Sequence, residues 1–201
     1  MIDKKLYDSF LEISRREING FIDSMDYEEI EKAARLILDA KKRGNRTHIS
    51  GIGKPAHIAG YIASLISSTG TPVYFLHGTE AVHGSCGQLV EGDAVIFISN
   101  SGETAEMKAA VNAVKNNGCL VIGVSGNRNS WLAGESDAFL YAGVSEEGGP
   151  LNRAPRMSIF AETFVLQALS IALQSDADIT PVQYVKWHPG GSLGKLREGE
   201  K

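Results

Sequence analysis

The sequence predicts an α/β protein in which parallel strands alternate with helices that cover both faces of one sheet. Short apolar runs that end in glycine or serine recur along the chain, and stretches with apolar residues at helical spacing separate them. The two middle units repeat one order of elements: strand, Gly/Ser loop, helix, glycine, strand. Because alternation of this kind is typical of parallel strands joined by crossover helices, a sheet with helices on both faces is expected.

Two helices are expected before the first strand. Residues 4–24 and 27–43 each carry apolar side chains at near-helical spacing. Asp26 is a favourable N-cap for the second helix, and Glu28 and Glu29 in its first turn suit the positive end of the helix dipole. We expect both helices to cover the sheet or to form a dimer contact.

Strands and helices then alternate from about residue 47. The expected strands are, in order, THISGIG, VYFLH, DAVIFIS, CLVIGVSG and AFLYAGV. The expected helices are PAHIAGYIASLISS, with Pro55 in its first turn, AEMKAAVNAVKNN, with Gly118 as its C-cap, and a long amphipathic stretch over residues 156–174. The tail after these elements holds WHPGGSLGK.

Length and composition exclude several classes of protein. The 201 residues suit one domain, since domains hold roughly 100–200 residues. The net charge of −4 and the lack of a basic cluster argue against nucleic-acid binding. Cys86 and Cys119 lie outside any metal-ligand or CxxC spacing, which fits a reducing cytoplasm. Because the sequence shows neither a signal peptide nor a run of about 18 apolar residues, we expect a cytoplasmic protein without a membrane partner.

Two glycine-rich loops follow predicted strands, at the carboxyl ends where open α/β sheets bind ligands. The first loop, residues 51–56, loosely matches the dinucleotide pattern GxGxxG/A, but no acidic residue follows about 20 positions later at the end of the second strand. Its distinctive member is Lys54, a positively charged residue between Gly53 and Pro55 at the N-terminus of a predicted helix. We expect Gly53 and Lys54 to bind substrate, and an ordinary exposed lysine is the alternative.

The second loop, residues 99–104 (SNSGET), opens a helix directly after the strand DAVIFI. Ser99, Ser101 and Thr104 bring three hydroxyls to this loop, and the helix N-terminus adds free N–H groups and its dipole. These groups, together with Asn100, favour a bound phosphate. The nucleotide pattern GxxxxGK[ST] is absent, so a sugar monophosphate fits better than a triphosphate. Helix capping is the alternative, although capping needs only one hydroxyl.

Candidates for acid–base chemistry lie near predicted strand ends or in loops: Glu80, His83, Glu106, Glu147, Glu162 and His188. Histidine suits proton transfer because its ordinary pKa lies near neutrality. The proline and glycines after His188 fix a tight turn that restrains the imidazole. His57 and His77 are assigned structural roles. No HxH, HExxH or CxxC pattern occurs, so no metal is expected, and a zinc site at His83 or His188 is the alternative.

Six segments carry a family resemblance: GIGK (51–54), STGTP (68–72), EAVHG (80–84), SNSGET (99–104), PLNRAP (150–155) and HPGGSLG (188–194). On these segments the chain resembles the SIS (sugar isomerase) domain, and it looks most like the bacterial D-arabinose-5-phosphate isomerases. The resemblance implies a three-layer α/β sandwich with a five-stranded parallel sheet. We expect a single SIS domain over residues 1–201, with N-terminal helices in 1–44 and the core in 45–196. The resemblance also implies a homodimer or a dimer of dimers with shared active sites, and isomerisation without a redox cofactor.

The resemblance assigns roles to individual residues. Ser99, Ser101 and Thr104 match the phosphate-binding loop of the family, and Lys54 matches the lysine that holds the sugar or the phosphate. The polar active-site positions are matched by His83, Glu106, Glu147 and His188. In related isomerases the C-terminal histidine reaches the site of a neighbouring subunit and helps to open the sugar ring, a role that we assign to His188.

Departures from the family pattern leave alternatives open. Pro55 and Ala56 stand where the arabinose-5-phosphate isomerases usually have Ser and Gly, so one hydroxyl near the phosphate is missing. Residues 156–162 look more like the phosphohexuloisomerases, whose base is a glutamate on this helix, and Glu162 therefore rivals Glu147 as the base. Many relatives continue into paired CBS domains, which this sequence does not contain.

The predicted reaction converts D-arabinose 5-phosphate to D-ribulose 5-phosphate through a cis-enediol. The expected roles are Glu147 or Glu162 as the base, His188 for ring opening, Lys54 with His83 for stabilisation, and Glu106 as a base or a helix-start charge. The alternatives are a 6-phospho-3-hexuloisomerase and a non-catalytic sugar-phosphate sensor. No cofactor, nucleic acid or membrane is expected as a partner.

Overall fold

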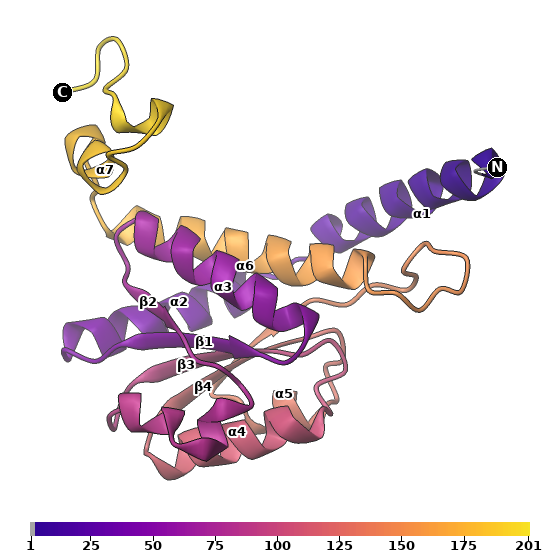
Figure 1. Cartoon of the computed structure of the whole chain (residues 1–201), viewed down its shortest axis with the longest axis horizontal. Coiled ribbons are helices and arrows are strands. Elements are labelled where there is room, and N and C mark those ends of the chain that lie inside the picture. Colours follow the sequence, from indigo (N-terminus) through magenta and orange to yellow (C-terminus); the bar gives the residue numbers. More distant parts are fainter. Residues whose placement is uncertain (1–2) are drawn as a thin grey trace.

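Five parallel strands form one sheet at the centre of the protein (Figure 1). The computed structural model describes residues 3–201, and its strands are β1 (Thr47–Gly51), β2 (Val73–Phe75), β3 (Ala94–Ile98), β4 (Leu120–Ser125) and β5 (Ala138–Tyr141). Their order is β2-β1-β3-β4-β5, and every neighbouring pair is parallel. The predicted α/β class and the five-stranded parallel sheet are therefore confirmed.

Helices cover both faces of this sheet. One face carries α2 (Tyr27–Lys42), α3 (Lys54–Ser68) and α6 (Met157–Asp176), and the other carries α4 (Ala105–Asn116), α5 (Trp131–Glu135) and the 3-10 helices η1 (Glu80–His83) and η2 (Ser85–Gln88). Two parts extend away from these layers (Figure 1): α1 (Lys4–Asp23) at one end, and α7 (Pro181–Trp187) with η3 (Ser192–Gly194) at the other. The three-layer sandwich is thus observed.

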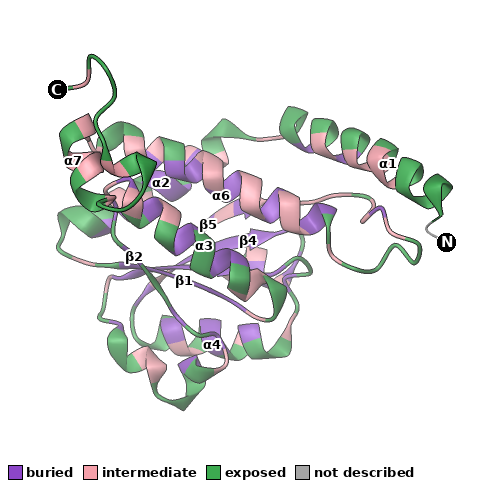
Figure 2. Cartoon of the chain, turned by 45° about the horizontal axis from the view of Figure 1, so that its top comes forward, coloured by how far each residue is buried: buried purple, intermediate pink, exposed green. Residues whose placement is uncertain are grey.

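Two apolar cores, one on each face of the sheet, hold the layers together. The sequence of β3, AVIFI, is buried along its whole length, which is typical of a parallel strand covered on both faces. Because side chains alternate along a strand, Ile96 and Ile98 join the core under α2, α3 and α6, whereas Val95 and Phe97 join the core under α4. Figure 2 shows the buried residues concentrated in the sheet and on the inner faces of the helices.

The long predicted helices agree closely with the observed ones. The Asp26 carboxylate accepts a hydrogen bond from the N–H of Glu28 at the start of α2, and Pro55 lies in the first turn of α3. Gly118 adopts a positive φ directly after α4. The strand predicted over VYFLH is shorter, since only Val73–Phe75 pairs with β1. The sequence did not predict α5 and α7, which have 5 and 7 residues and are too short to show helical periodicity.

One helix among residues 3–201, α6, is long and apolar enough to cross a membrane, judged by length and composition alone. Half of that apolar stretch is buried inside the protein, where Ala161, Val165 and Leu169 belong to the core. α6 also packs against both α2 and α3. The apolar composition of α6 is therefore accounted for by its packing in the core.

The strand order reverses between β1 and β3. From β1 the chain moves outward to β2, returns past β1 to β3, and continues through β4 to β5. In open parallel sheets such a reversal leaves a crevice at the carboxyl ends of the two strands, and ligands bind there; this order is the flavodoxin-like one. Gly51 pairs with Ile98, so the loops after β1 and β3 begin side by side. By this rule, we expect the ligand crevice of this fold between these two loops.

Candidate active site

Three connections meet at the carboxyl edge of the sheet. Lys54 begins α3 just after β1, residues 99–104 join β3 to α4, and residues 142–156 join β5 to α6. All five strands are parallel, so the loops that follow them share one edge. The structure thus brings Lys54, the SNSGET loop and Glu147 to the same side of the sheet.

The loop of residues 99–104 is a compact turn held by its own polar groups. The Ser99 hydroxyl accepts a hydrogen bond from the N–H of Gly102 at 3.2 Å and lies 3.4 Å from the Thr104 hydroxyl. The Ser101 hydroxyl accepts from the N–H of Glu103 at 3.2 Å. Gly102 has a φ of 66°, and a Cβ there would lie 2.3 Å from Oγ of Ser130. The turn therefore requires glycine at this position.

The first turn of α4 keeps its N–H groups available for a ligand. Thr104 is the N-cap residue, yet its side chain makes no capping hydrogen bond. Among residues 3–201 no acceptor meets the backbone N–H groups of residues 105–107. A helix N-terminus with free N–H groups attracts anions through those groups and through the helix dipole. The capping alternative for Thr104 is therefore wrong, and its hydroxyl is available to a phosphate.

Lys54 lies on the other side of the crevice as an exposed first residue of α3. Within residues 3–201 its ammonium group has no ion-pair partner. Gly53 before it has a φ of 67° and supplies no side-chain cap. Gly51 approaches the helix so closely that a Cβ there would lie 2.7 Å from the carbonyl carbon of Pro55. The close backbone packing fixes the start of α3, and with it the backbone of Lys54, at the end of β1.

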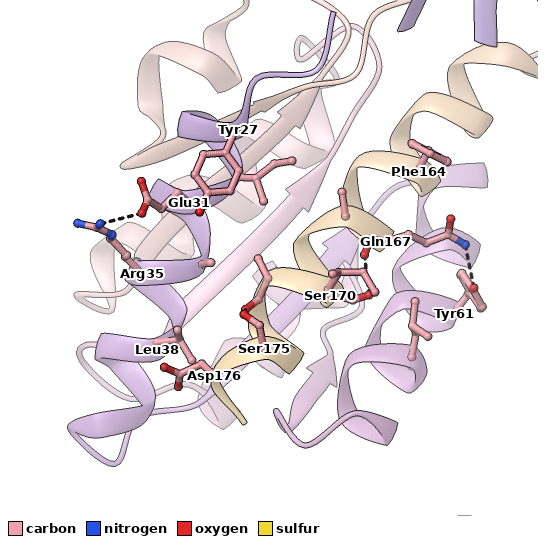
Figure 3. Close-up of a pocket in the computed structure, with 16 residues that line it drawn as sticks. Tyr27, Glu31, Arg35, Leu38, Tyr61, Phe164, Gln167, Ser170, Ser175 and Asp176 are labelled. Atoms are coloured by element: carbon pink, nitrogen blue, oxygen red, sulfur yellow. Dashed lines mark hydrogen bonds and ion pairs between the residues drawn. The ribbon is translucent and has the colours of Figure 1, made fainter. Parts of the chain in front are cut away.

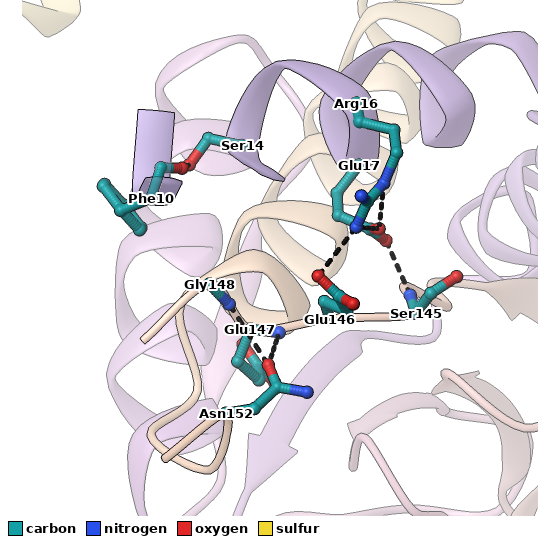
Figure 4. A network of polar contacts seen from close by, with 9 residues as sticks. All are labelled: Phe10, Ser14, Arg16, Glu17, Ser145, Glu146, Glu147, Gly148 and Asn152. Carbon is teal, nitrogen blue, oxygen red and sulfur yellow. Dashed lines mark hydrogen bonds and ion pairs between the residues drawn. The ribbon is translucent and has the colours of Figure 1, made fainter. Parts of the chain in front are cut away.

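Glu147 is held at the N-terminus of α6. Its Oε2 accepts hydrogen bonds from the N–H of Arg156 at 2.5 Å and from the N–H of Ser158 at 3.2 Å. The backbone of Glu147 is fixed by Asn152, whose Oδ1 accepts from the N–H groups of Glu147 at 2.6 Å and Gly148 at 3.3 Å (Figure 4). These hydrogen bonds hold the Glu147 carboxyl group in one position at the carboxyl edge of the sheet.

The segment that carries Glu147 is fixed from α1, a role that the sequence did not predict. Glu17 accepts a hydrogen bond from the N–H of Ser145 at 2.6 Å, and Arg16 bridges Glu17 and Glu146 at 3.0 and 2.8 Å (Figure 4). Burial opposes the charge of Glu17, but the Ser145 N–H and Arg16 outweigh it and lower the pKa of Glu17. The partners lie 128 positions apart in the sequence, so no local pattern could have revealed this contact.

Glu162, the rival base, lies in the interior of the protein. It is fully buried on α6, and both of its carboxyl oxygens lack a hydrogen-bond partner within residues 3–201. Burial, together with the charge of Glu147, raises the pKa of Glu162 to about 8. Since none of its surface is exposed, Glu162 has no direct contact with the crevice, whereas the partly exposed Glu147 does reach the edge.

The remaining predicted residues near the crevice are exposed. Glu106 occupies the second position of α4, His83 ends η1, and the Asn100 side chain lies in the SNSGET loop. The backbone carbonyl of Asn100 accepts hydrogen bonds from the Ser125 hydroxyl at 3.0 Å and from the N–H of Gly126 at 2.9 Å. These bonds fix the SNSGET loop to the end of β4.

His188 is not brought to this site within one chain. It ends α7, its ring stacks on Tyr184 with centroids 4.0 Å apart, and its Nδ1 lies 2.8 Å from the Tyr184 carbonyl oxygen. α6 begins at the Glu147 segment and spans 20 residues, or ~30 Å, before the chain reaches α7 (Figure 1). A role for His188 in catalysis therefore requires the site of another copy of the chain.

Residues 3–201 hold no group of three or more His, Cys, Asp or Glu side chains arranged for a metal ion. His77, assigned a structural role, contacts the Thr79 hydroxyl through Nδ1 at 3.0 Å. The polar groups at the carboxyl edge thus include hydroxyls, backbone N–H groups, the ammonium group of Lys54 and the carboxyl groups of Glu106 and Glu147. This set can bind a phosphate at one end and remove a proton at the other.

Sequence comparisons place the chain among known proteins. The family model described as SIS domain matches residues 41–172. Arabinose 5-phosphate isomerase KpsF of Escherichia coli strain CFT073 is 36% identical over 171 residues, covering 85% of this chain and 51% of the relative. Arabinose 5-phosphate isomerase KdsD of Pseudomonas aeruginosa is 38% identical over 168 residues, covering 84% and 51%. This chain thus spans about half the length of these curated relatives.

A solved structure matches over nearly the whole chain. The structure of c3406 from E. coli CFT073 in complex with arabinose 5-phosphate has a TM-score of 0.82 and 33% sequence identity to this chain. The match covers 94% of this chain and 100% of that one. The part of this chain outside the match is shorter than either end segment, so the match includes parts of both the N-terminal helices and the C-terminal segment in addition to the sheet.

Proposed function

The chain belongs to the SIS domain family, and on this basis we propose that it is an aldose–ketose isomerase of sugar phosphates. The proposed substrate is D-arabinose 5-phosphate and the product D-ribulose 5-phosphate. One observation carries the proposal: a helix N-terminus with free N–H groups and hydroxyls shares an edge of the sheet with Glu147, a carboxylate held by backbone N–H groups. The names of the curated relatives and the arabinose 5-phosphate complex of c3406 support the choice of substrate.

The mechanism assigns separate roles to the two sides of the crevice. Ser99, Ser101, Thr104 and the N–H groups of α4 bind the phosphate, so that binding energy positions the reacting carbons near Glu147. Glu147 takes the proton from C2 of the open-chain aldose, which leaves a cis-enediol, and returns it to C1 to give the ketose. A proton moves from O2 to O1 in the same conversion, and Lys54 stabilises the negative charge that develops on these oxygens.

We also propose that a second copy of the chain completes the site with His188. The length of α6 separates His188 from Glu147 within one chain. A groove of about 950 Å³ lies between α2, α3 and α6 (Figure 3), and its lining includes Leu38, Leu65, Phe164 and Ile171. Ile171 is 66% exposed. An apolar surface of this kind is typical of a protein–protein contact, and it supports self-association as a dimer or tetramer.

Subunit complementation tests the shared site. Glu147→Gln and His188→Ala are each expected to be inactive, whereas their mixture regains activity, because one site of each heterodimer carries both intact residues. In an equal mixture that exchanges freely, about a quarter of the sites of a dimer are intact. If the two inactive variants have the correct mass and fold but never regain activity on mixing, His188 does not act in the site of the neighbouring subunit.

A panel of sugar phosphates tests the reaction. We expect turnover of D-arabinose 5-phosphate, detected as formation of the ketose. D-Ribose 5-phosphate, hexose 6-phosphates and 6-phospho-3-hexulose are the other candidate substrates of the panel. Lys54→Met is expected to lose at least tenfold in kcat/KM, whereas the exposed Lys32→Met on α2 serves as the matched control. Turnover of 6-phospho-3-hexulose alone would favour the hexuloisomerase alternative. Binding without turnover of any sugar phosphate would favour the sensor.

A cytoplasmic location is part of the same proposal. Both cysteines are free thiols in the structure, as a reducing compartment favours. Burial raises the pKa of Cys86, and burial raises that of Cys119 to about 11. Both thiols therefore stay protonated near neutral pH and react slowly with oxidants.

A further inference from the structure

Glu103 is the charged member of the SNSGET loop, and the phosphate-binding role of this loop leaves it unexplained. A carboxylate in the loop opposes the binding of a phosphate, because like charges repel each other. Glu103 also directly precedes Thr104, the N-cap residue of α4, where an acidic side chain can itself occupy the positive end of the helix dipole. The loop therefore carries an acid at the position where it should attract an anion.

Both carboxyl oxygens of Glu103 have partners other than the N–H groups of α4. Oε1 accepts a hydrogen bond from the backbone N–H of Trp131 at 2.7 Å, and Oε2 pairs with the ammonium group of Lys108 at 2.5 Å. The Lys108 ammonium group also lies over the Trp131 ring, 5.5 Å from its centroid. Glu103 thus does not cap α4, and the N–H groups of residues 105–107 have no acceptor within residues 3–201.

The partners of Glu103 belong to a fixed part of the protein. Trp131 is the first residue of α5, and its side chain packs against the apolar core under α4. The next residue, Leu132, is fully buried in that core, and its N–H donates a hydrogen bond to the Gly102 carbonyl oxygen at 3.1 Å. Two neighbouring residues of the SNSGET loop are therefore tied to two neighbouring residues of α5.

Lys108 opposes the charge that Glu103 brings to the loop. The hydrogen bond from Lys108, followed by the one from the Trp131 N–H, lowers the pKa of Glu103. The carboxylate is therefore ionised at neutral pH, with a positive charge in direct contact with it. A phosphate at the loop meets a neutral ion pair in place of a single negative charge.

We propose that Glu103 and Lys108 are a positioning pair of the phosphate site: the carboxylate ties the SNSGET loop to α5, and the ammonium group cancels the charge that this tie introduces. The proposal rests on the proposed function, in which the loop binds the phosphate of the substrate. Neither residue contacts the phosphate in this scheme. Both act through the position and the local charge of the loop.

A double-mutant cycle tests the pair on the affinities for inorganic phosphate and for D-arabinose 5-phosphate, both measured by calorimetry. Glu103→Gln removes the charge but keeps an oxygen for the Trp131 N–H. Lys108→Met leaves the Glu103 carboxylate without its counter-charge, and we expect both affinities to fall about fivefold at low salt. When Glu103→Gln is already present, Lys108→Met should change them by less than about twofold. Glu106, a second acid at the start of α4, is the same in all four proteins, so its charge cancels in the comparison.

Lys115 and Glu135 form the matched control pair. They also join α4 to α5, at the same distance of 2.5 Å and with comparable exposure, but near the C-terminal ends of both helices. Seven positions separate Lys115 from Lys108 along α4, which corresponds to ~10 Å. Lys115→Met and Glu135→Gln remove the same kinds of charge and should leave both affinities within about twofold.

Two results of the cycle would overturn the pair. Equal weakening by Lys108→Met in the wild type and in Glu103→Gln would mean that Lys108 binds the phosphate directly. An affinity that Lys108→Met does not change would mean that the charge of Glu103 does not reach the phosphate. Melting temperatures of all variants show whether each one is folded. The effect of Lys108→Met should also shrink as salt is added, because salt screens exposed charges.

Isomerase kinetics separate positioning from catalysis. Lys108→Met is expected to raise KM for D-arabinose 5-phosphate about fivefold and to keep kcat within about twofold, because the substrate and the transition state share the phosphate contact. A folded Lys108→Met enzyme that loses as much kcat as Glu147→Gln would overturn the positioning role. If the wild type binds inorganic phosphate with the expected coupling but turns over no sugar phosphate, the proposed isomerase fails while the pair stands. If the wild type binds neither phosphate nor any sugar phosphate, the pair is overturned together with the phosphate site.

Discussion

The SNSGET loop and the Glu147 segment lie at the same edge of the sheet, but they are built in different ways. The loop of residues 99–104 forms its turn through hydrogen bonds between its own members, within five positions of one another, and its further bonds reach β4 and α5, the next strand and helix along the chain. The Glu147 segment depends on contacts with α1 and with the start of α6, the first of them across 128 positions. The proposed phosphate end of the site thus depends on elements close in the sequence, whereas the proposed base end depends on a contact with the distant α1. Substitutions in the two regions should accordingly differ in what they damage.

The largest expected effect comes from Glu147→Gln. It removes the proposed base but retains an oxygen that can accept from the N–H groups of Arg156 and Ser158. We expect kcat to fall by about 10²–10⁴-fold, the usual range for loss of a general base. The affinity for sugar phosphate, measured by calorimetry, should change little because the phosphate loop is untouched. A variant that loses affinity and keeps kcat would contradict the division of the site into a phosphate end and a base end.

Gly102→Ala should damage the local region most. The residue has a φ of 66°, and its new Cβ would lie 2.3 Å from Oγ of Ser130. The backbone conformation and the overlap together are expected to cost about 3 kcal/mol in unfolding free energy. Gly134→Ala is the matched control, because Gly134 lies on the neighbouring α5 with no atom close to a new Cβ. Equal stability of the two variants would show that the turn does not require glycine.

The difference between the two regions also explains what the sequence could reveal. The strands, the long helices and the loop of residues 99–104 between β3 and α4 follow from periodicity and from turn residues in sequence, and all were predicted. Lys54 and Ser99 were predicted for the same reason, since each closely follows a buried strand. Glu17 and Asn152 could not be found in this way, because their roles exist only once α1 and the chain before α6 come together. The burial of Glu162 likewise depends on helices distant in sequence.

Glu17→Gln tests the long-range region without touching the crevice. It weakens the charged hydrogen bonds to the Ser145 N–H and to Arg16, which should cost about 2 kcal/mol in unfolding free energy and several-fold in kcat/KM. The pKa of Glu17 is lowered by folding, so its contribution is present at neutral pH and is lost as the pH falls below the ordinary range of glutamate. Glu12→Gln, on an exposed part of the same helix, is the control. If Glu17→Gln lowers the unfolding free energy by the same amount at acidic pH as at neutral pH, the charge of Glu17 is not the cause of the loss.

Ser101→Ala should have the smallest effect, and its comparison with Thr104→Val sharpens the account of the local region. The Ser101 hydroxyl already accepts a hydrogen bond from the N–H of Glu103, so its loss affects the loop as well as the ligand, by about 1 kcal/mol in total. The Thr104 hydroxyl makes no capping bond, and its one hydrogen-bond contact within residues 3–201 is with the Ser99 hydroxyl, so the effect of its loss should fall mainly on phosphate binding. We therefore expect Thr104→Val to weaken sugar-phosphate affinity more than Ser101→Ala while lowering the melting temperature less. The reverse order in both measurements would mean that Thr104 supports the loop and Ser101 binds the phosphate.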